Sequence, residues 1–451
     1  MARLDVDYFE AHFADVPGRG VRLLMSSYLL GSLLQSPMMA QAARIARLPH
    51  VARPISIYPD ASPKPFGFPA GVVVTTEPGW LYPLSAPDMG CGYLVVDTGI
   101  ELDPEAIEDD LLDDTFDEFV AGIDVGSPER EKVTTSARAI MADGISAVGV
   151  PVHFGVDSAE AEESNSWLPR ADLLDATFVD SDLQASLGSA AGHFVACYVV
   201  ERSLSPASPP VGRVIVVVHV GAAPIRDHLN KLGVFAELAA LAIDNGISTA
   251  EDAADGLFAV DLSSSRGGAL LGAAMASRNF GYANRQLVAD TVVRVLRSRL
   301  KRYAARDAVQ LRHVDHVAFE SVNGAVRSRR GLQPLHEQRP IFITGGEHTH
   351  GYLATTGQRP SAVDGLCCHG IPVRNTEVVP LSALAGAGSD LSPSSARGWA
   401  DTMVSNTRFD EGRFWSESAN LEIVMSYLAG SEIAHPAARL RQLMNYRELK
   451  L

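Results

Sequence analysis

The stretch Asp88-Met89-Gly90-Cys91-Gly92 constrains the fold of this chain more than any other part of its sequence. Apolar residues of strand character precede it at 71–75 and resume at 93–96, so its glycines mark a tight turn between strands. A carboxylate and a thiol three residues apart in such a turn can point at one place. Oxygen and sulfur together suit Mn²⁺, Zn²⁺, Co²⁺ or Fe²⁺ better than Mg²⁺. The alternative interpretation, a capped bend with a buried thiol, is the commoner outcome of this pattern taken alone.

Three histidines stand in comparable places farther along the chain. Each borders or interrupts an apolar stretch: His193 after the small-residue loop 187–192, His219 after the run 214–218, and His316 within the strand-like segment 313–319. A single histidine of this kind is more often a core residue than a ligand. Together with Asp88 and Cys91, the three predict a site for one or two transition-metal ions. Ligands spread from residue 88 to residue 316 suit a catalytic centre better than a zinc finger.

Hydrophobic periodicity predicts a mixture of helices and strands. We expect strands at 72–74, 94–96, 195–200, 214–218 and 340–344, and helices over much of 1–50, at 40–47, 267–300, 419–427 and 436–443. The acidic segment 101–118 is expected to be a solvated helical face. The basic segment 294–302 is either another solvated face or a contact for a phosphate backbone. A glycine-rich turn at 345–351 could offer backbone N–H groups to phosphate oxygens.

Composition narrows the classes of function. A formal net charge of −16 argues against wide, non-specific coating of nucleic acid, which needs clustered Lys and Arg. The four cysteines include the adjacent pair Cys367 and Cys368, so a disulfide framework is not expected and a reducing compartment fits. The N-terminus lacks the pattern of a signal peptide, and the apolar stretch 21–34 is too short to span a membrane. We therefore expect a cytoplasmic protein with neither a membrane nor DNA as its partner.

Several motifs resemble those of the RtcB family of RNA-splicing ligases, from about residue 40 to residue 450. The similar segments are Arg47-Leu48-Pro49, Tyr58-Pro59-Asp60, Gly67-Phe68-Pro69-Ala70-Gly71-Val72, Asp88-Met89-Gly90-Cys91-Gly92, Gly192-His193-Phe194, His219 with Gly221, Ala283-Asn284-Arg285-Gln286, Val314-Asp315-His316, Ser328-Arg329-Arg330-Gly331 and Cys368-His369-Gly370. The most specific of these include the segment around Ala283-Asn284-Arg285-Gln286. The resemblance implies an enzyme that depends on Mn²⁺ and GTP.

The resemblance also implies a role for each matching residue. Asp88, Cys91 and His193 would bind one Mn²⁺, while Cys91, His219 and His316 would bind a second; Zn²⁺ and Co²⁺ are alternatives. His369 would be the nucleophile that attacks the α-phosphate of the nucleotide. Gly345, Gly346 and Thr349 would lie in the loop that holds the triphosphate, and Lys450 would stand on the guanine side. For His316 the alternatives His313 and Glu320 stay open.

This sequence departs from the family pattern around the substrate. The glutamate expected to read guanine is Ala196, the histidine of the P-D-V-H motif is Ser62, and an arginine expected after His219 is missing. The triphosphate loop gains a negative charge at Glu347. The expected metal ligands and nucleophile are therefore present, whereas the residues around the substrate differ.

Three functions follow as hypotheses. The first is an RNA ligase of the RtcB type, which joins an RNA 3′-phosphate or 2′,3′-cyclic phosphate to a 5′-hydroxyl through a histidine–GMP intermediate. The second is a metal-dependent nucleotidyltransferase or ligase that acts on a small molecule or another nucleotide. The third is a non-catalytic binder of metal or nucleotide. The resemblance implies one α+β domain over residues 1–451, with mixed sheets around a central metal cleft, outer helices and an N-terminal helical extension at 1–40.

Overall fold

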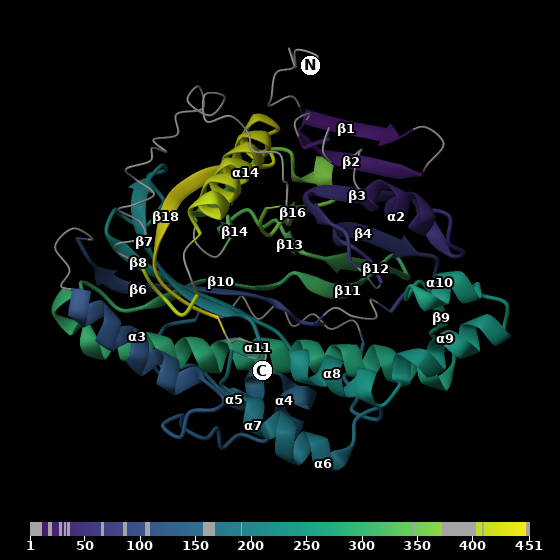
Figure 1. Ribbon diagram of the computed structural model, residues 1–451, viewed down its shortest axis with the longest axis horizontal. Coiled ribbons are helices and arrows are strands. Elements are labelled where there is room, and N and C mark those ends of the chain that lie inside the picture. Colours follow the sequence, from purple (N-terminus) through teal and green to yellow (C-terminus); the bar gives the residue numbers. More distant parts are fainter. Residues whose placement is uncertain are drawn as a thin grey trace.

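The computed structural model describes residues 11–16, 20–26, 29, 30, 33, 37–64, 67–83, 88–103, 109–156, 167–190, 192–346, 349–371, 403–407 and 410–447. Within these ranges the chain has the expected mixed α+β architecture. Two large sheets stand side by side above one long helix (Figure 1). Two further sheets have two short strands each: β5 (Trp80–Leu81) pairs with β9 (Val260–Asp261), and β13 (Leu332–Pro334) pairs with β16 (Leu366–Cys368).

The larger sheet curls into a half-barrel. Its order is β10-β6-β8-β7-β18-β15-β14, with β17 paired to β18. The strands are β6 (Gly92–Glu101), β7 (Phe194–Ser203), β8 (Arg213–Val220), β10 (Val309–Asp315), β14 (Ile341–Thr344), β15 (Gly351–Thr356), β17 (Val404–Ser405) and β18 (Ala434–Arg447). The central strands are runs of valine because both of their faces are buried. One face meets helices and the other lines the inside of the half-barrel.

The second sheet corrects the prediction for the N-terminal region. Its order is β1-β2-β3-β4-β12-β11, formed by β1 (Ala11–Val16), β2 (Val21–Ser26), β3 (Val51–Ser62), β4 (Ala70–Thr76), β11 (Val317–Val322) and β12 (Ala325–Arg330). The expected helix is wrong across β1 and β2. A short apolar run fits both periods, and here pairing with β3 decides between them.

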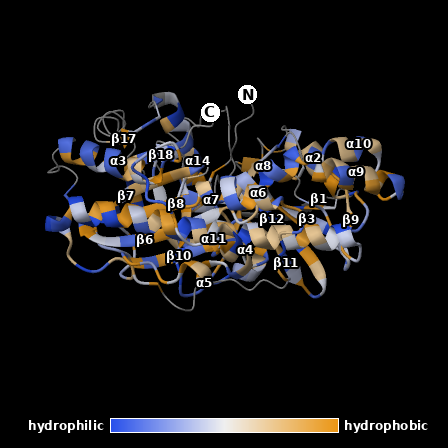
Figure 2. Ribbon diagram, turned by 90° about the horizontal axis from the view of Figure 1, so that it is seen from below, coloured by the Kyte–Doolittle hydropathy of each residue, from blue (hydrophilic) through white to orange (hydrophobic). Residues whose placement is uncertain are grey.

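The long helix α11 (Ser265–Arg299) confirms the helix expected at 267–300 and lies beneath both sheets (Figure 1). Most of its residues as far as Leu296 are buried, because small side chains allow strands and loops to pack closely on it. Viewed from below in Figure 2, hydrophobic segments colour both this helix and strands β6, β7 and β8, whose apolar side chains pack against it in one buried cluster. The other helical elements are α2 (Pro37–Ile45), α3 (Asp109–Ile123), α4 (Ala137–Asp143), α5 (Ile145–Val148), α6 (Ala176–Phe178), the π-helical turn Val179–Leu183, α7 (Gln184–Ser186), α8 (Ala223–Lys231), α9 (Val234–Asp244), α10 (Ala250–Ala254), the 3₁₀ turns Lys301–Tyr303 and Pro360–Val363, and α14 (Glu411–Gly430).

Strand β18 corrects the prediction of a helix at 436–443. The Ala-, Arg- and Leu-rich composition of this segment favours a helix, but pairing with β7 and β15 overrides that preference. Leu440 faces the inside of the half-barrel, whereas Leu443 and Tyr446 face the helices. The consequence for function is direct, because β18 carries polar residues into the cavity described below.

The basic segment 294–302 faces acidic residues. Arg299 forms an ion pair with Glu118 on α3, and Arg294 lies 4.0 Å from Glu131. Arg297 donates to the backbone carbonyls of Thr98 and Arg306. These contacts engage three of the five basic residues in the segment that the sequence had suggested as a contact for a phosphate backbone.

The cysteines and the helices can also be compared with what the composition led us to expect. All four cysteines are buried and none forms a disulfide. Among the described residues, no helix combines the length and the apolar character needed to cross a membrane.

Candidate active site

The turn that carries Asp88 and Cys91 is built by close backbone contacts. The Cys91 N–H donates to the Asp88 carbonyl at 2.9 Å, and Gly90 adopts a φ of +76°, which favours glycine. A Cβ on Gly92 would lie 2.0 Å from the carbonyl oxygen of Val314, so only glycine lets β10 approach β6 here. The His316 N–H then donates to the Cys91 carbonyl at 2.8 Å. Local backbone geometry therefore brings His316 next to Cys91.

The five predicted ligands converge on one place. Cys91 Sγ lies 3.2 Å from His193 Nε2, 3.1 Å from His219 Nε2 and 3.1 Å from His316 Nε2. His193 Nε2 is also 3.0 Å from Asp88 Oδ2. The donor atoms fall into two groups that share the thiol: Asp88, Cys91 and His193, and Cys91, His219 and His316.

The chemistry of this donor set fits metal ions. His219 Nε2 and His316 Nε2 lie 3.1 Å apart, and the same thiol touches both, so shared protons cannot satisfy every pair. Ligand atoms about 2.1–2.3 Å from a tetrahedral ion lie about 3.4–3.7 Å from one another, so a small outward shift would admit one. Burial, followed by the charges of neighbouring histidines, lowers the pKa of His219 and of His316 well below the usual value. Both rings are thus neutral, which is the form that binds metals.

The charge balance is different at His193. Burial lowers its pKa, but Cys91 and Asp88 outweigh burial and raise the pKa well above its usual value. Without a metal ion, the raised pKa favours the imidazolium form of His193. A cation between the three side chains would replace that proton.

The two alternatives to His316 lie elsewhere. His313 is buried, with its ring 4.6 Å from that of Tyr282, and Glu320 forms ion pairs with Arg327 and Arg329. Neither belongs to the two groups of converging donor atoms. The geometry therefore favours His316 over both.

Side chains of helix α11 form hydrogen bonds with the segments that carry the converging donor atoms. Asn284 accepts from the Gly188 N–H at 2.7 Å and donates to the Ser189 carbonyl at 3.0 Å, just before His193. Arg285 donates to the carbonyls of Gly90 and Val220, which are the neighbours of Cys91 and His219. The physical reason for the Asn-Arg motif is thus that it positions three segments that carry the converging donor atoms.

We expect Arg285→Met to lower metal affinity by about 10- to 100-fold, the usual cost of losing a residue that orients ligands. The substitution leaves two buried carbonyls without their donor, and both ligand segments then loosen. Mn²⁺ binding is measured by titration calorimetry, with thermal unfolding at saturating metal as a check of folding. Arg294→Met, on the exposed side of the same helix, is the matched control. A folded Arg285→Met protein with unchanged affinity would contradict this role.

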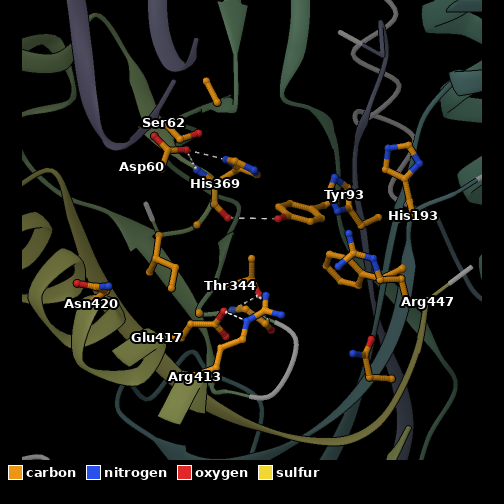
Figure 3. Close-up of a pocket in the computed structure, with 18 of the residues that line it drawn as sticks. Asp60, Ser62, Tyr93, His193, Thr344, His369, Arg413, Glu417, Asn420 and Arg447 are labelled. Atoms are coloured by element: carbon orange, nitrogen blue, oxygen red, sulfur yellow. Dashed lines mark hydrogen bonds and ion pairs between the residues drawn. The ribbon is translucent and has the colours of Figure 1, made fainter. Parts of the chain in front are cut away.

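A cavity of about 590 Å³ opens beside the donor cluster, within the size range of small-molecule sites. His193, His219 and His369 line it together with Gly345 and Gly346. In Figure 3, Asp60, Ser62 and His369 lie on one side, and Arg413 and Glu417 of α14 lie on the opposite side. The cavity thus joins both large sheets and the C-terminal helix.

His369 is held by its Nδ1. That atom lies 2.6 Å from Asp60 Oδ2 and 2.7 Å from the Gly331 carbonyl oxygen, both of which accept a hydrogen bond. These two acceptors place a proton on Nδ1, so that in the neutral ring the lone pair is on Nε2. The ring of His369 is 4.3 Å from that of His316, centroid to centroid, so this imidazole is next to the donor cluster.

Sequence reasoning assigned no role to Asp60 or Tyr93. The Asp60 side chain is completely buried, at the end of β3, and the sequence signal was its position in the Tyr58-Pro59-Asp60 motif. Tyr93 directly follows the turn at 88–92, and its ring packs against those of His219 and His316, with centroids 4.8 and 5.2 Å away. Its hydroxyl donates to the His369 carbonyl at 3.3 Å. Only the folded chain shows that Tyr93 joins His369 to the cluster of donor atoms.

The residues predicted to bind the nucleotide do not all line the cavity. Gly345 and Gly346 line the cavity, but their N–H groups donate to the His350 carbonyl and the Thr344 hydroxyl. Thr349 is buried, and its hydroxyl donates to the His350 carbonyl at 3.2 Å. Lys450 lies outside the described residues. Arg447, three residues earlier, does line the cavity.

Comparison with known families agrees with this geometry. The family described as tRNA-splicing ligase RtcB matches residues 41–371, most of the chain, including the five converging donors and His369. The chain belongs to the RtcB family. Enzymes of the RtcB family are RNA ligases that generally use Mn²⁺ and GTP. No match was found among curated proteins.

Proposed function

We propose that this RtcB-family chain forms one catalytic domain and ligates RNA ends through nucleotidyl transfer by His369. The observation that carries the proposal is the arrangement of His369, with Nδ1 on Asp60 and its ring 4.3 Å from His316 in a cavity. A neutral imidazole with a fixed tautomer is a competent nucleophile. The cluster beside it supplies the place where phosphate charge would be neutralised.

In the first step, Nε2 of His369 attacks the α-phosphorus of GTP. A P–N bond forms, the bond to the β-phosphate oxygen breaks, and pyrophosphate leaves. Asp60 keeps the Nδ1 proton and stabilises the positive charge that develops on the ring. Mn²⁺ held by Asp88, Cys91, His193, His219 and His316 would neutralise the phosphates and favour in-line geometry.

The next two steps use the RNA ends. An oxygen of the RNA 3′-phosphate attacks the phosphorus on His369, so the P–N bond breaks and the guanylyl group moves to the RNA. The 5′-hydroxyl then attacks the activated 3′-phosphate, a phosphodiester forms and GMP leaves. His369 regains its lone pair, so the cycle can begin again.

A two-part assay tests this proposal. Protein, Mn²⁺ and α-³²P GTP should yield a labelled adduct, and addition of RNA with 3′-phosphate and 5′-hydroxyl ends should release the label and yield joined RNA. RNA with 3′-hydroxyl and 5′-phosphate ends is the matched control and should do neither. Absence of an adduct with every nucleoside triphosphate would contradict nucleotidyl transfer.

Asp60→Asn should slow formation of the adduct by about 100-fold or more, since the wrong tautomer and a tilted ring misplace Nε2. Asp60 acts through His369 and is therefore a positioning residue. The expected signature is a lower rate at saturating GTP with unchanged Mn²⁺ stoichiometry, followed in single-turnover labelling. A rate equal to that of the original protein would show that the hydrogen bond has no part in the reaction.

A second candidate is nucleotidyl transfer to a small molecule or another nucleotide. The observation that favours it is the pairing of Arg299 and Arg294 with Glu118 and Glu131, which removes a candidate RNA contact from a chain of net charge −16. In the assay above, an adduct that RNA ends cannot discharge, but a small-molecule acceptor can, would support this candidate over RNA ligation.

A further inference from the structure

One wall of the cavity is made by the end of β18. Gln442, Asn445 and Arg447 all line it, although residues three apart in a regular strand face opposite sides. The register between β18 and β7 shifts between Gln442 and Met444, and this irregularity turns both carboxamides inward. Asn445 is paired with Ala196 on β7, and Arg447 with Phe194. The local defect in the ladder thus creates a polar wall inside an otherwise apolar half-barrel.

Gln442 has one hydrogen-bonding atom in need of a partner. Its side chain is only 1% exposed, and Nε2 donates to the Tyr198 hydroxyl at 3.0 Å. With Nε2 placed against that hydroxyl, no described residue donates to Oε1, which is buried. A buried acceptor without a donor costs about 1–3 kcal/mol, so a ligand N–H at this point would bind favourably.

Opposite Asn445, the small Ala196 contributes no polar group. A carboxylate there would accept from N1–H and the 2-amino group of guanine and would repel the N1 lone pair of adenine. Carboxamides carry both a donor and an acceptor, so they pair with either purine. Guanine offers N1–H to Gln442 Oε1, and adenine offers its 6-amino group from the neighbouring position on the same edge.

We propose that the β18 wall, Gln442 with Asn445, reads the nucleobase in this chain, and that it accepts adenine and guanine nucleotides alike. This inference rests on the proposed function, since it concerns the same nucleotide. It changes the cofactor from GTP alone to a purine nucleoside triphosphate. The wall formed by Gln442 and Asn445 carries no carboxylate that would discriminate between the bases, and its carboxamides supply hydrogen bonds that do not.

The test compares GTP with ATP in two assays. Equilibrium binding is measured on the His369→Ala protein with Mn²⁺, which needs no covalent step, and labelling is measured on the intact enzyme. We expect the two nucleotides to differ by less than tenfold in both. Asn445→Asp, which is isosteric, and Ala196→Glu should each shift the ratio toward GTP by about tenfold or more, the discrimination that one good base contact provides.

Further variants separate specificity from folding. Gln442→Met should weaken ATP and GTP binding alike by about tenfold or more, because both bases lose the same acceptor. Glu432→Gln, beyond the end of α14 and outside the cavity, is the control and should change neither. If Ala196→Glu fails to fold, Asn445→Asp carries the comparison.

The outcomes distinguish this inference from the proposed function. A preference of the original protein for GTP above tenfold, or variants that leave the ratio unchanged, would overturn the role of the β18 wall. Equal binding without labelling would retain the wall and contradict the nucleophile. If neither nucleotide binds, both proposals are wrong.

Discussion

His369→Ala should abolish the nucleotide adduct completely. The substitution removes the only atom that the proposed mechanism uses to form the P–N bond, and among the described histidines no other has its Nδ1 on Asp60. His193, His219 and His316 direct their Nε2 atoms at Cys91, so they cannot replace it. Gel detection of α-³²P label, with Mn²⁺ present, measures the effect.

The matched control for this experiment is His435→Ala. His435 is partly exposed beside Glu432, outside the cavity, and its loss should leave labelling unchanged. Metal content should also be unchanged in His369→Ala, because His369 belongs to neither group of converging donors. Persistent label in the His369→Ala protein would place the nucleophile elsewhere.

Cys91→Ala should have the second large effect, because it removes the one atom common to both donor groups. Each group retains only two donor residues. Affinity for both ions should therefore fall by more than about 100-fold, beyond the usual cost of losing a residue that only orients ligands. We expect Mn²⁺ content after desalting to fall below one ion per chain and the adduct to disappear. Elemental analysis and calorimetry measure the loss.

A second cysteine provides the control. Cys197 is also buried but lies in the middle of β7 and belongs to neither group, so Cys197→Ala should retain the metal. Thermal unfolding with and without chelator completes the test, since an ion that binds only the folded chain raises its stability. Full Mn²⁺ content in Cys91→Ala would contradict a shared thiol ligand.

Local sequence pattern was sufficient to single out the residues that converge in the structure, because each stands near the end of a strand or at a turn. Asp88, Cys91, His193, His219 and His316 each border an apolar run or a glycine turn, and such short-range signals survive in a single sequence. The same holds for the helix at 267–300 and for the valine-rich strands. These elements depend on periodicity and on glycine, which are properties of neighbouring residues.

Local pattern failed where partners distant in sequence decide the outcome. Residues 21–26 and 436–443 read as helices, yet pairing with β3 in one case, and with β7 and β15 in the other, makes them strands. Because 436–443 was predicted as a helix, nothing in the sequence indicated that Gln442, Asn445 and Arg447 line the cavity beside β7. β-structure depends on contacts that no window of sequence contains.

The sequence by itself determined which side chains could bind metal and attack phosphate, since their types and local contexts define that chemistry. The tertiary structure alone decided which of them meet. It brings Cys91 within 3.1–3.2 Å of three histidines, favours His316 over His313 and Glu320, and sets Asp60 against His369 across 309 residues of chain. The physical reason is that convergence requires the packing of both sheets on α11, which is a property of the whole fold.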